Sequence, residues 1–205
     1  MNARQADAPS ICLDRAAIQR GNRLVLREFS LSAKAADIIW IRGANGSGKS
    51  TLLRALCGLL PLAAGTLSIT GRIALTDDAI ALDPERSLED NLRFWARLDS
   101  ASHARLERAL EALDLVSLAE LPVRFLSAGQ KRRASLARML ASGAPIWLLD
   151  EPYNGLDQAN VVRLDEALRR HAADGGIALV ASHIAPTITV AHSLLIGQPS
   201  GASRA

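Results

Sequence analysis

The feature that most constrains the fold is a glycine-rich run, Gly43-Ala44-Asn45-Gly46-Ser47-Gly48-Lys49-Ser50-Thr51. It follows an apolar, strand-like segment at 38–42 and precedes a helical pattern that starts at Lys49 and ends near Gly58. A strand, a G-x-x-x-x-G-K-[ST] turn and a helix form the phosphate-binding loop of nucleotide hydrolases. Glycines let backbone N–H groups face an anion, and the helix N-terminus adds positive potential. We therefore predict that Lys49 reaches the terminal phosphates of ATP and that the Ser50 hydroxyl ligates Mg²⁺.

Length and composition favour one packed α/β domain over residues 1–205. The hydrophobic fraction is 49%, which supports a core and argues against disorder. Aromatic residues make up only 3%, and the net charge is +3 with both signs spread along the chain. Neither a stacking surface nor a basic patch is indicated, so no nucleic-acid partner is expected.

The order of the predicted elements indicates an α/β fold with a mostly parallel core sheet. Two β segments at 11–18 and 24–31 predict an antiparallel N-terminal part, and two short strands at 66–70 and 72–76 are expected to join at Gly71. Helical patterns then predict an inserted helical subdomain over about 84–140. Ordinary crossover helices packed on the sheet are the alternative.

The two cysteines, Cys12 and Cys57, each lie in an apolar pattern, and we expect buried free thiols. The apolar stretch at 52–69 is interrupted by Arg54, Gly58 and Pro61, so it is not expected to span a membrane.

A pair of acids, Asp150 and Glu151, follows the apolar strand pattern at 145–150. Ligands of open parallel sheets bind beyond the carboxyl ends of the strands, where the phosphate loop also lies. We expect Asp150 to hold Mg²⁺ beside Ser50 and Glu151 to position or deprotonate the attacking water. Solvated acids at a strand exit are the alternative. His183 follows the strand pattern at 177–182 at the same edge, although a single histidine there is more often structural.

The segment Leu126-Ser127-Ala128-Gly129-Gln130 admits two interpretations. Ser127 and Gln130 have the spacing of a helix capping box. The segment also resembles the signature of the nucleotide-binding subunits of ABC transporters, and it follows the helical region and precedes the acid-tipped strand as it does in that family. Asn154-Gly155-Leu156-Asp157 resembles the family's D-loop and His183 its switch histidine. The resemblance extends over about 11–196.

The resemblance implies an ABC-type P-loop fold that binds ATP with Mg²⁺ and hydrolyses it. It implies a head-to-tail dimer on ATP, in which one copy supplies the phosphate loop and the other supplies Ser127 and Gly129 to the γ-phosphate. Gln130 and Asp157 are expected to bind the nucleotide as well. Lys49, Glu151 and His183 would act in catalysis, with His183 contacting the γ-phosphate.

A narrower resemblance is to the haem exporter ATP-binding subunits of cytochrome c maturation. It is carried by short segments: Ala128 within the signature, Arg132-Arg133, Leu136-Ala137-Arg138, Asn91-Leu92-Arg93-Phe94-Trp95, the run from Trp147 to Pro152, and Gly175-Gly176-Ile177. It implies integral membrane subunits as partners and a peripheral location on the cytoplasmic face of the inner membrane. An ATPase for another exporter, of lipid, peptide or a small molecule, stays open, as does a soluble ABC ATPase acting on nucleic acid.

Two positions depart from the family pattern. The glutamine expected near the end of the strand at 72–76 is absent, and Asp77 or Asp78 is the candidate substitute. The aromatic residue that stacks on adenine is also absent, and the guanidinium of Arg20 is the candidate there.

Overall fold

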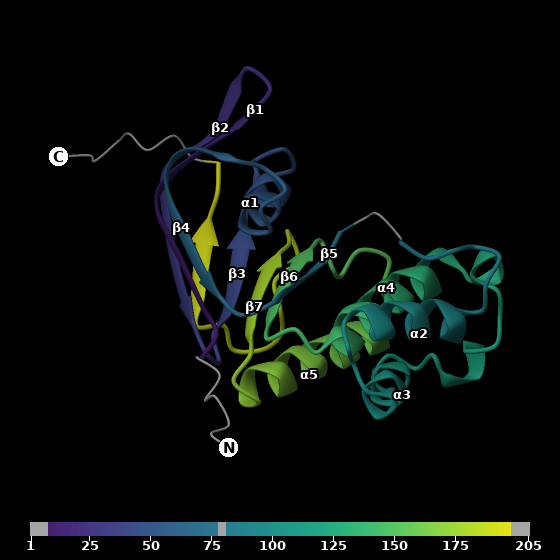
Figure 1. Ribbon diagram of the computed structural model, residues 1–205. Helices are drawn as coiled ribbons and strands as arrows, with labels where there is room; N and C mark the ends of the chain where they lie inside the picture. The colour runs from purple at the N-terminus through teal and green to yellow at the C-terminus, as the bar shows by residue number, and fades with distance from the viewer. Residues whose placement is uncertain (1–7, 78–80, 198–205) are drawn as a thin grey trace.

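A three-stranded antiparallel sheet covers one end of the molecule (Figure 1). The computed structural model describes residues 8–77 and 81–197. In this sheet β1 (Ser10–Arg20) lies between β2 (Arg23–Lys34) and β4 (Leu62–Thr70). Leu13 pairs with Leu31 on one side and with Leu67 on the other. The predicted antiparallel part is therefore present, and β4 begins four residues earlier than the sequence pattern indicates.

The core is a five-stranded parallel sheet in the order β5-β6-β7-β3-β8. Its members are β5 (Ile73–Thr76), β6 (Ile146–Asp150), β7 (Ile177–Ala181), β3 (Ile38–Arg42) and β8 (His192–Leu195). β8 is not apparent from the sequence. It is an edge strand, and its exposed polar residues His192 and Ser193 break the apolar pattern that marks β3, β6 and β7.

The two short strands predicted on either side of Gly71 are present as β4 and β5, but they do not share a sheet. β4 belongs to the antiparallel sheet and β5 to the parallel sheet, so the chain changes sheets at this glycine. Gly71 has φ +113°, a conformation that L side chains rarely adopt, and a Cβ there would lie 3.1 Å from Pro145 Cγ.

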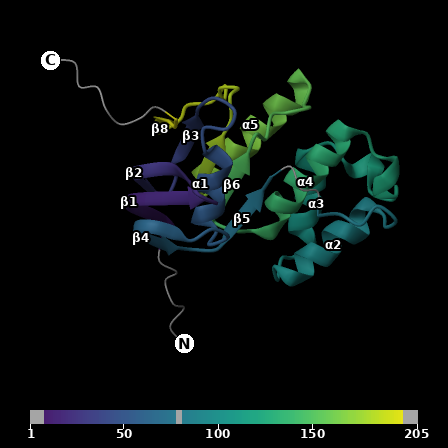
Figure 2. The same ribbon diagram turned by 90° about the horizontal axis from the view of Figure 1, so that it is seen from above.

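The helices are distributed on both sides of the parallel sheet. α1 (Lys49–Leu56) lies on the side of the antiparallel sheet, and α5 (Gln158–Ala173) covers the other side (Figure 2). Between β5 and β6 the chain forms α2 (Leu88–Leu98), α3 (His103–Ala112), the 3₁₀ turns η1 (Val116–Leu118) and η2 (Val123–Phe125), and α4 (Ala128–Ser142). In both views α2 and α3 lie against α4 and away from the antiparallel sheet (Figures 1 and 2). They occupy the region where the helical subdomain is predicted.

Alternating side chains of β6 divide the core into two clusters. Ile146 and Leu148 pack with α1 and the antiparallel sheet, and Trp147 and Leu149 pack with α4, α5 and the helices between β5 and β6. The period of two residues along a strand explains the division, because successive side chains point to opposite faces. β6 therefore joins both halves of the core and carries Asp150 at its end.

The prediction of two buried thiols is wrong. Cys12 is exposed and Cys57 is partly buried. Cys12 alternates along β1 with the buried Ile11 and Leu13, so strand geometry turns it to the solvent face. Burial, and secondarily the charge of Asp77, raises the pKa of Cys57 to about 11. Among the described residues, no helix combines the length and apolar character needed to cross a bilayer.

Candidate nucleotide site

In the loop between β3 and α1, no side chain caps the backbone N–H groups at the start of α1. Gly48 caps α1 with φ +109°, and no side chain makes a capping hydrogen bond there. A Cβ at Gly48 would lie 2.6 Å from Val25 Cγ1, so the site requires glycine for space as well as for its dihedral angle. The first-turn N–H groups of a helix have no intrahelical acceptor and attract anions. The loop therefore fits the phosphate chain of a nucleotide.

Lys49 lies folded across this loop. Its side chain is only 6% exposed, and Nζ donates hydrogen bonds to the carbonyl oxygens of Gly43 at 2.9 Å and Ala44 at 3.4 Å. The same Nζ lies 3.1 Å from Oε1 of Glu151. The ammonium group of Lys49 is thus held inside the loop by the carboxylate of Glu151, the residue that follows β6.

Glu151 also contacts the end of β7 and the residue His183 that follows this strand. It follows β6 with φ +45°, and its N–H donates to the carbonyl of Ala181 at 2.7 Å. Its Oε2 accepts the backbone N–H of His183 at 3.3 Å and lies 2.8 Å from His183 Nδ1. The ends of β6 and β7 and the start of α1 therefore converge on one carboxylate.

The pKa of Glu151 results from opposing effects. Burial alone raises it, but hydrogen bonds from His183 and Lys49, together with the charge of Lys49, outweigh burial and lower the pKa below its ordinary value of 4.5. Glu151 is consequently a carboxylate at neutral pH. An ionised carboxylate can accept a hydrogen bond or a proton from water.

Asp150 is the last residue of β6 and is 91% buried, with a relative exposure of 9%. α1, which carries Ser50 in its first turn, packs against β6. Across the described residues no group of three or more His, Cys, Asp or Glu side chains forms a metal site. A hydroxyl and one carboxylate nevertheless suit Mg²⁺, which usually takes few protein ligands and completes its shell with phosphate oxygens and water.

Arg132 is the site residue that the sequence reasoning missed. It is buried on α4, and Nη2 donates to the carbonyl oxygens of Asp150 at 2.6 Å and Glu151 at 2.7 Å. Nη1 donates to the carbonyl of Asp77 at 2.8 Å. The guanidinium therefore joins the ends of β5 and β6. The sequence shows an arginine two residues after the Ser127–Gln130 segment, but it shows neither the burial of this side chain nor its carbonyl acceptors.

The signature-like segment forms the predicted capping box. Ser127 N–H donates to Oε1 of Gln130 at 2.7 Å, and Gln130 N–H donates to Oγ of Ser127 at 3.2 Å. The Ser127 hydroxyl hydrogen is left to donate elsewhere, and the side chain is exposed. Gly129 approaches the D-loop-like segment closely, since a Cβ there would lie 2.9 Å from the carbonyl of Gly155. Asp157 caps α5 by accepting the N–H of Asn160 at 2.9 Å.

Comparison with known proteins decides the family. The family model described as ABC transporter matches residues 26–154. The chain is 50% identical over 187 residues to the cytochrome c biogenesis ATP-binding export protein CcmA of Sphingopyxis alaskensis, covering 91% of this chain and 96% of that protein. It is also 50% identical over 167 residues to CcmA of Novosphingobium aromaticivorans, covering 82% and 85%. The chain belongs to the ABC transporter family.

The fold of this ABC protein agrees with solved structures. A structure of the ATP-binding subunit of an ABC transporter superposes with a TM-score of 0.77 at 25% identity, covering 85% of this chain and 79% of the other. The predicted ABC-type α/β fold and ATPase class are thus confirmed. ATPase subunits of this family dimerise and act with membrane transporter components.

The predicted site residues of this ABC ATPase fall into two groups. The structure brings Lys49, Glu151 and His183 into contact beside the loop of residues 43–51. Ser127, Gly129, Gln130 and Asp157 gather where α4 and α5 begin. In the part of the chain that the structure describes, no hydrogen bond or ion pair joins the signature residues to the loop. Arg20 lies exposed at the tip of the β1–β2 hairpin, and Asp78 is outside the described residues.

Proposed function

We propose that this chain is the ATP-hydrolysing subunit of a cytochrome c maturation transporter, coupling ATP binding and hydrolysis to export of haem or to release of a haem-loaded chaperone. The observation that carries the proposal is the 50% identity to CcmA of S. alaskensis across nearly the full length of both proteins. The convergence of Lys49, Glu151 and His183 beside an intact phosphate loop supports retained activity.

In the proposed site, residues 43–51 wrap the phosphates of ATP with backbone N–H groups. Ser50 and Asp150 would hold Mg²⁺, which supplies charge neutralisation at the phosphates when bound. Lys49 would turn from the carbonyls of Gly43 and Ala44 toward the phosphate oxygens, because phosphate is a stronger partner for an ammonium than a neutral carbonyl.

Glu151 is proposed as the group that orients the attacking water. Its carboxylate is ionised at neutral pH and is fixed on one side by His183, so it presents an acceptor of defined direction. His183 is exposed beyond this contact and would reach the γ-phosphate, as the family resemblance implies. A well-placed base of this kind contributes about 10²–10⁴-fold in rate.

The second group of residues is proposed to serve a partner copy. Ser127 is exposed with a hydroxyl hydrogen to spare, and it begins a helix whose dipole favours anions. In a head-to-tail dimer, Ser127, Gly129, Gln130 and Asp157 of one copy would complete the ATP site of the other. Arg20 would stack on the base, and Asp77 or Asp78 would take the place of the absent glutamine.

Integral subunits of the transporter are the proposed membrane partners, which would place this chain on the cytoplasmic face of the inner membrane as a peripheral protein. The segment between β5 and β6 exposes several large apolar side chains: Phe94, Leu98, Val116, Leu121 and Phe125. Large apolar side chains that remain exposed are suited to a protein interface.

Complementation tests the proposal. The chain would be expressed in a bacterium lacking its own CcmA, and covalently haem-bound cytochrome c would be measured by haem staining after denaturing electrophoresis. We expect restoration by the natural chain and by Glu107→Gln, an exposed glutamate on α3, and none by Glu151→Gln. An active ATPase that restores no cytochrome c and co-purifies with other integral subunits would instead assign it to a different exporter.

A further inference from the structure

Asp165 is a buried carboxylate on α5, with a relative exposure of 2%. Its Oδ1 accepts the hydroxyl of Tyr153 at 2.5 Å, and its Oδ2 accepts the N–H of Thr187 at 2.9 Å. The Thr187 hydroxyl also donates to Oδ2. Burying a charge is unfavourable unless hydrogen bonds satisfy it, and here both oxygens are engaged. One side chain of α5 therefore joins a loop that follows β6 to a loop that follows β7.

The first of these loops carries Glu151, and Tyr153 lies two residues beyond it. Glu151 has φ +45°, in the left-handed region that residues other than glycine occupy only where the surrounding structure holds them. The ring of Tyr153 is buried, and its hydroxyl is bound to Asp165. This hydrogen bond helps to hold the turn after β6, and it thereby fixes the backbone that directs Glu151.

The second loop carries His183. Residues 182–191, all within the described part of the chain, join β7 to β8 without regular secondary structure. Ser182 is held at the start of the loop, since its N–H donates to the carbonyl of Ile41 at 3.1 Å and its carbonyl accepts Nε1 of Trp40 at 2.9 Å. The backbone is thus fixed by β3 on the N-terminal side of His183.

Thr187 fixes the same loop on the C-terminal side of His183. Thr187 is exposed, but it donates two hydrogen bonds to the buried Asp165, and the next residue, Ile188, is buried in the core. Between these two fixed points the His183 ring lies with Nδ1 2.8 Å from Oε2 of Glu151. The contact between His183 and Glu151 therefore depends on two loops that share Asp165.

A carboxylate at position 165 does more than fill space in the core. Replacing buried charged groups by apolar side chains of similar volume is often neutral or stabilising, so stability alone does not require an ion here. Hydrogen bonds to a carboxylate are short and directional, and they determine where each donor lies. The separation of Tyr153 from Thr187 is accordingly set by the two oxygens of Asp165.

We infer that Asp165 is a positioning residue for ATP hydrolysis that keeps His183 against Glu151. It does so by holding Tyr153 and Thr187 on one carboxylate, and this role rests on the functions proposed for His183 and Glu151. A carboxylate only accepts hydrogen bonds, so Nδ1 of His183 carries the hydrogen in its contact with Glu151. Loss of the Thr187 hydroxyl would loosen the loop, let exchange with solvent place that hydrogen on Nε2, and leave Glu151 without a fixed direction toward water.

The test replaces Thr187, because this residue is exposed and its variants leave the core intact. Thr187→Val keeps the shape of the side chain but lacks the hydroxyl that donates to Asp165. We expect the kcat for ATP of the purified full-length chain to fall about tenfold, the effect of losing one hydrogen bond to a charged group, with KM unchanged. Thr187→Ser keeps the hydroxyl and should keep the natural kcat. Thermal unfolding shows that each variant is folded.

The ring of His183 supplies a readout that a purely structural role would not change. The chain has four histidines, and His183→Ala assigns the signals of this ring. Long-range ¹H–¹⁵N spectra in mildly alkaline buffer, where histidine rings are neutral, distinguish a hydrogen on Nδ1 from one on Nε2. We expect the Nδ1–H form in the natural chain and in Thr187→Ser, and a mixture of both forms in Thr187→Val.

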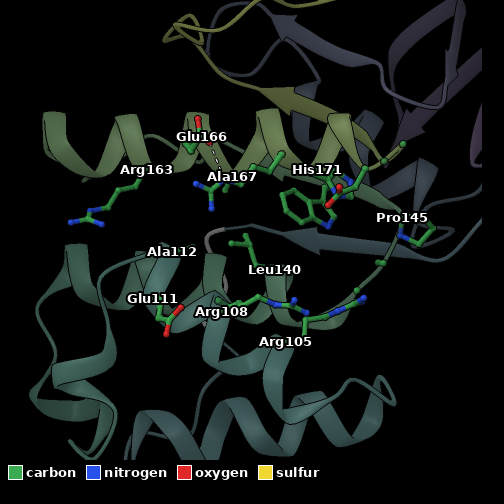
Figure 3. A pocket seen from close by; sticks show the side chains of 18 of the residues that line it. Arg105, Arg108, Glu111, Ala112, Leu140, Pro145, Arg163, Glu166, Ala167 and His171 are labelled. Atoms are coloured by element: carbon green, nitrogen blue, oxygen red, sulfur yellow. Dashed lines mark hydrogen bonds and ion pairs between the residues drawn. The ribbon is translucent and has the colours of Figure 1, made fainter.

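Glu166→Gln is the matched control on the same helix. Glu166 follows Asp165, but it lines the cavity between α3 and α5, as Figure 3 shows. Its carboxylate pairs with Arg169 and Arg170 near the surface, where ion pairs contribute little. Both kcat and the His183 signals should therefore keep their natural values.

Either a natural kcat or an unchanged His183 tautomer in Thr187→Val would overturn the inference. An equal fall in kcat in Thr187→Ser or in Glu166→Gln would overturn it as well, because both variants keep the hydroxyl on Asp165. His183→Ala separates this outcome from a failure of the proposed function. A natural kcat in His183→Ala would refute the role proposed for His183 itself, whereas a reduced kcat there beside a natural kcat in Thr187→Val would refute the role of Asp165 alone.

Discussion

Lys49 and Glu151 form an ion pair, with Nζ 3.1 Å from Oε1, although 102 positions separate them in the sequence. The pair is largely buried, with side-chain exposures of 6% and 15%. Removing one partner of a buried pair leaves the other charge uncompensated, which is more damaging than losing an exposed pair. The phosphate loop and the acid at the end of β6 therefore depend on each other before any nucleotide binds.

Replacing Lys49 with Ala should abolish nucleotide binding or reduce ATP turnover about 10²-fold or more, since a cation at the phosphates is lost. The measurement is ATPase activity at saturating ATP together with equilibrium binding of ATP. Lys34→Ala, an exposed lysine at the end of β2, is the matched control. Normal turnover in Lys49→Ala would contradict the assignment of the phosphate loop.

Replacing Glu151 with Gln should preserve ATP binding and lower hydrolysis about 10²-fold or more, because the amide cannot take up a proton from water. If the head-to-tail arrangement is right, ATP will hold this variant as a dimer, which light scattering coupled to gel filtration detects. Undiminished hydrolysis together with a monomeric profile in ATP would argue against Glu151 as the catalytic carboxylate.

The lowered pKa of Glu151 predicts a specific dependence of stability on pH. A carboxylate whose pKa is lower in the folded state than in the unfolded state stabilises the fold at any pH above the unfolded-state pKa, here 4.5. This contribution is lost as the pH falls through the folded-state pKa. We expect the difference in thermal stability between the natural chain and Glu151→Gln to be constant from pH 7 to about 5 and to shrink below pH 4.5. A difference that instead grew on acidification would show that the ionised form is not the stabilised one.

Replacing Tyr153 with Phe should destabilise the fold by about 1–3 kcal/mol, the usual effect of depriving a buried acceptor of its donor. The Tyr153 hydroxyl donates to Oδ1 of Asp165 at 2.5 Å, and Asp165 is 2% exposed. Burial, followed by the hydrogen bond to Asp165, raises the pKa of Tyr153. Urea unfolding measures the effect, and a double-mutant cycle with Asp165→Asn isolates the coupling. Additivity of the two changes would refute a direct interaction.

Replacing Arg132 with Lys should reduce both stability and turnover. The three carbonyl acceptors at Asp77, Asp150 and Glu151 are spanned by two nitrogens of one planar group, which a single ammonium cannot reproduce. Loss of a hydrogen bond from a charged donor corresponds to about 1.5–3 kcal/mol. Unfolding in urea and the ATPase rate are measured beside Arg133→Lys, the neighbouring arginine on α4. Arg133 donates to the carbonyl oxygens of Leu113 and Asp114, both at 2.7 Å, so Arg133→Lys should also lose stability but should keep its ATPase rate. An equal loss of turnover at the two positions would remove the special role of Arg132.

The sequence predicts the parts of this fold that depend on local chemistry. Glycines at positive φ, such as Gly48, and uninterrupted apolar strands, such as β6, carry their own signal. The signature segment is likewise readable, because the capping box at Ser127 involves residues only three positions apart.

The relationships that the sequence does not predict depend on partners far apart in the chain. β8 is defined by pairing with β3, since its own residues are half polar and exposed. Arg132 acquires its importance only when β5 and β6 end side by side. The apolar neighbourhood of Cys12 predicts burial wrongly, because it does not say which face of a strand a residue occupies.

The pairing of β3 has a consequence for the order in which the protein can form during synthesis. β3 contains residues 38–42, and both of its neighbours, β7 and β8, come from the last thirty residues of the described chain. Ile38, for example, is paired with Ala178. Contacts between residues so far apart in the sequence form late in folding, because the long loop between them must close before the contact can stabilise the fold. On the ribosome, the strand that leads into the ATP loop stays without neighbours until almost the entire chain has emerged, so nascent fragments should be unable to bind nucleotide.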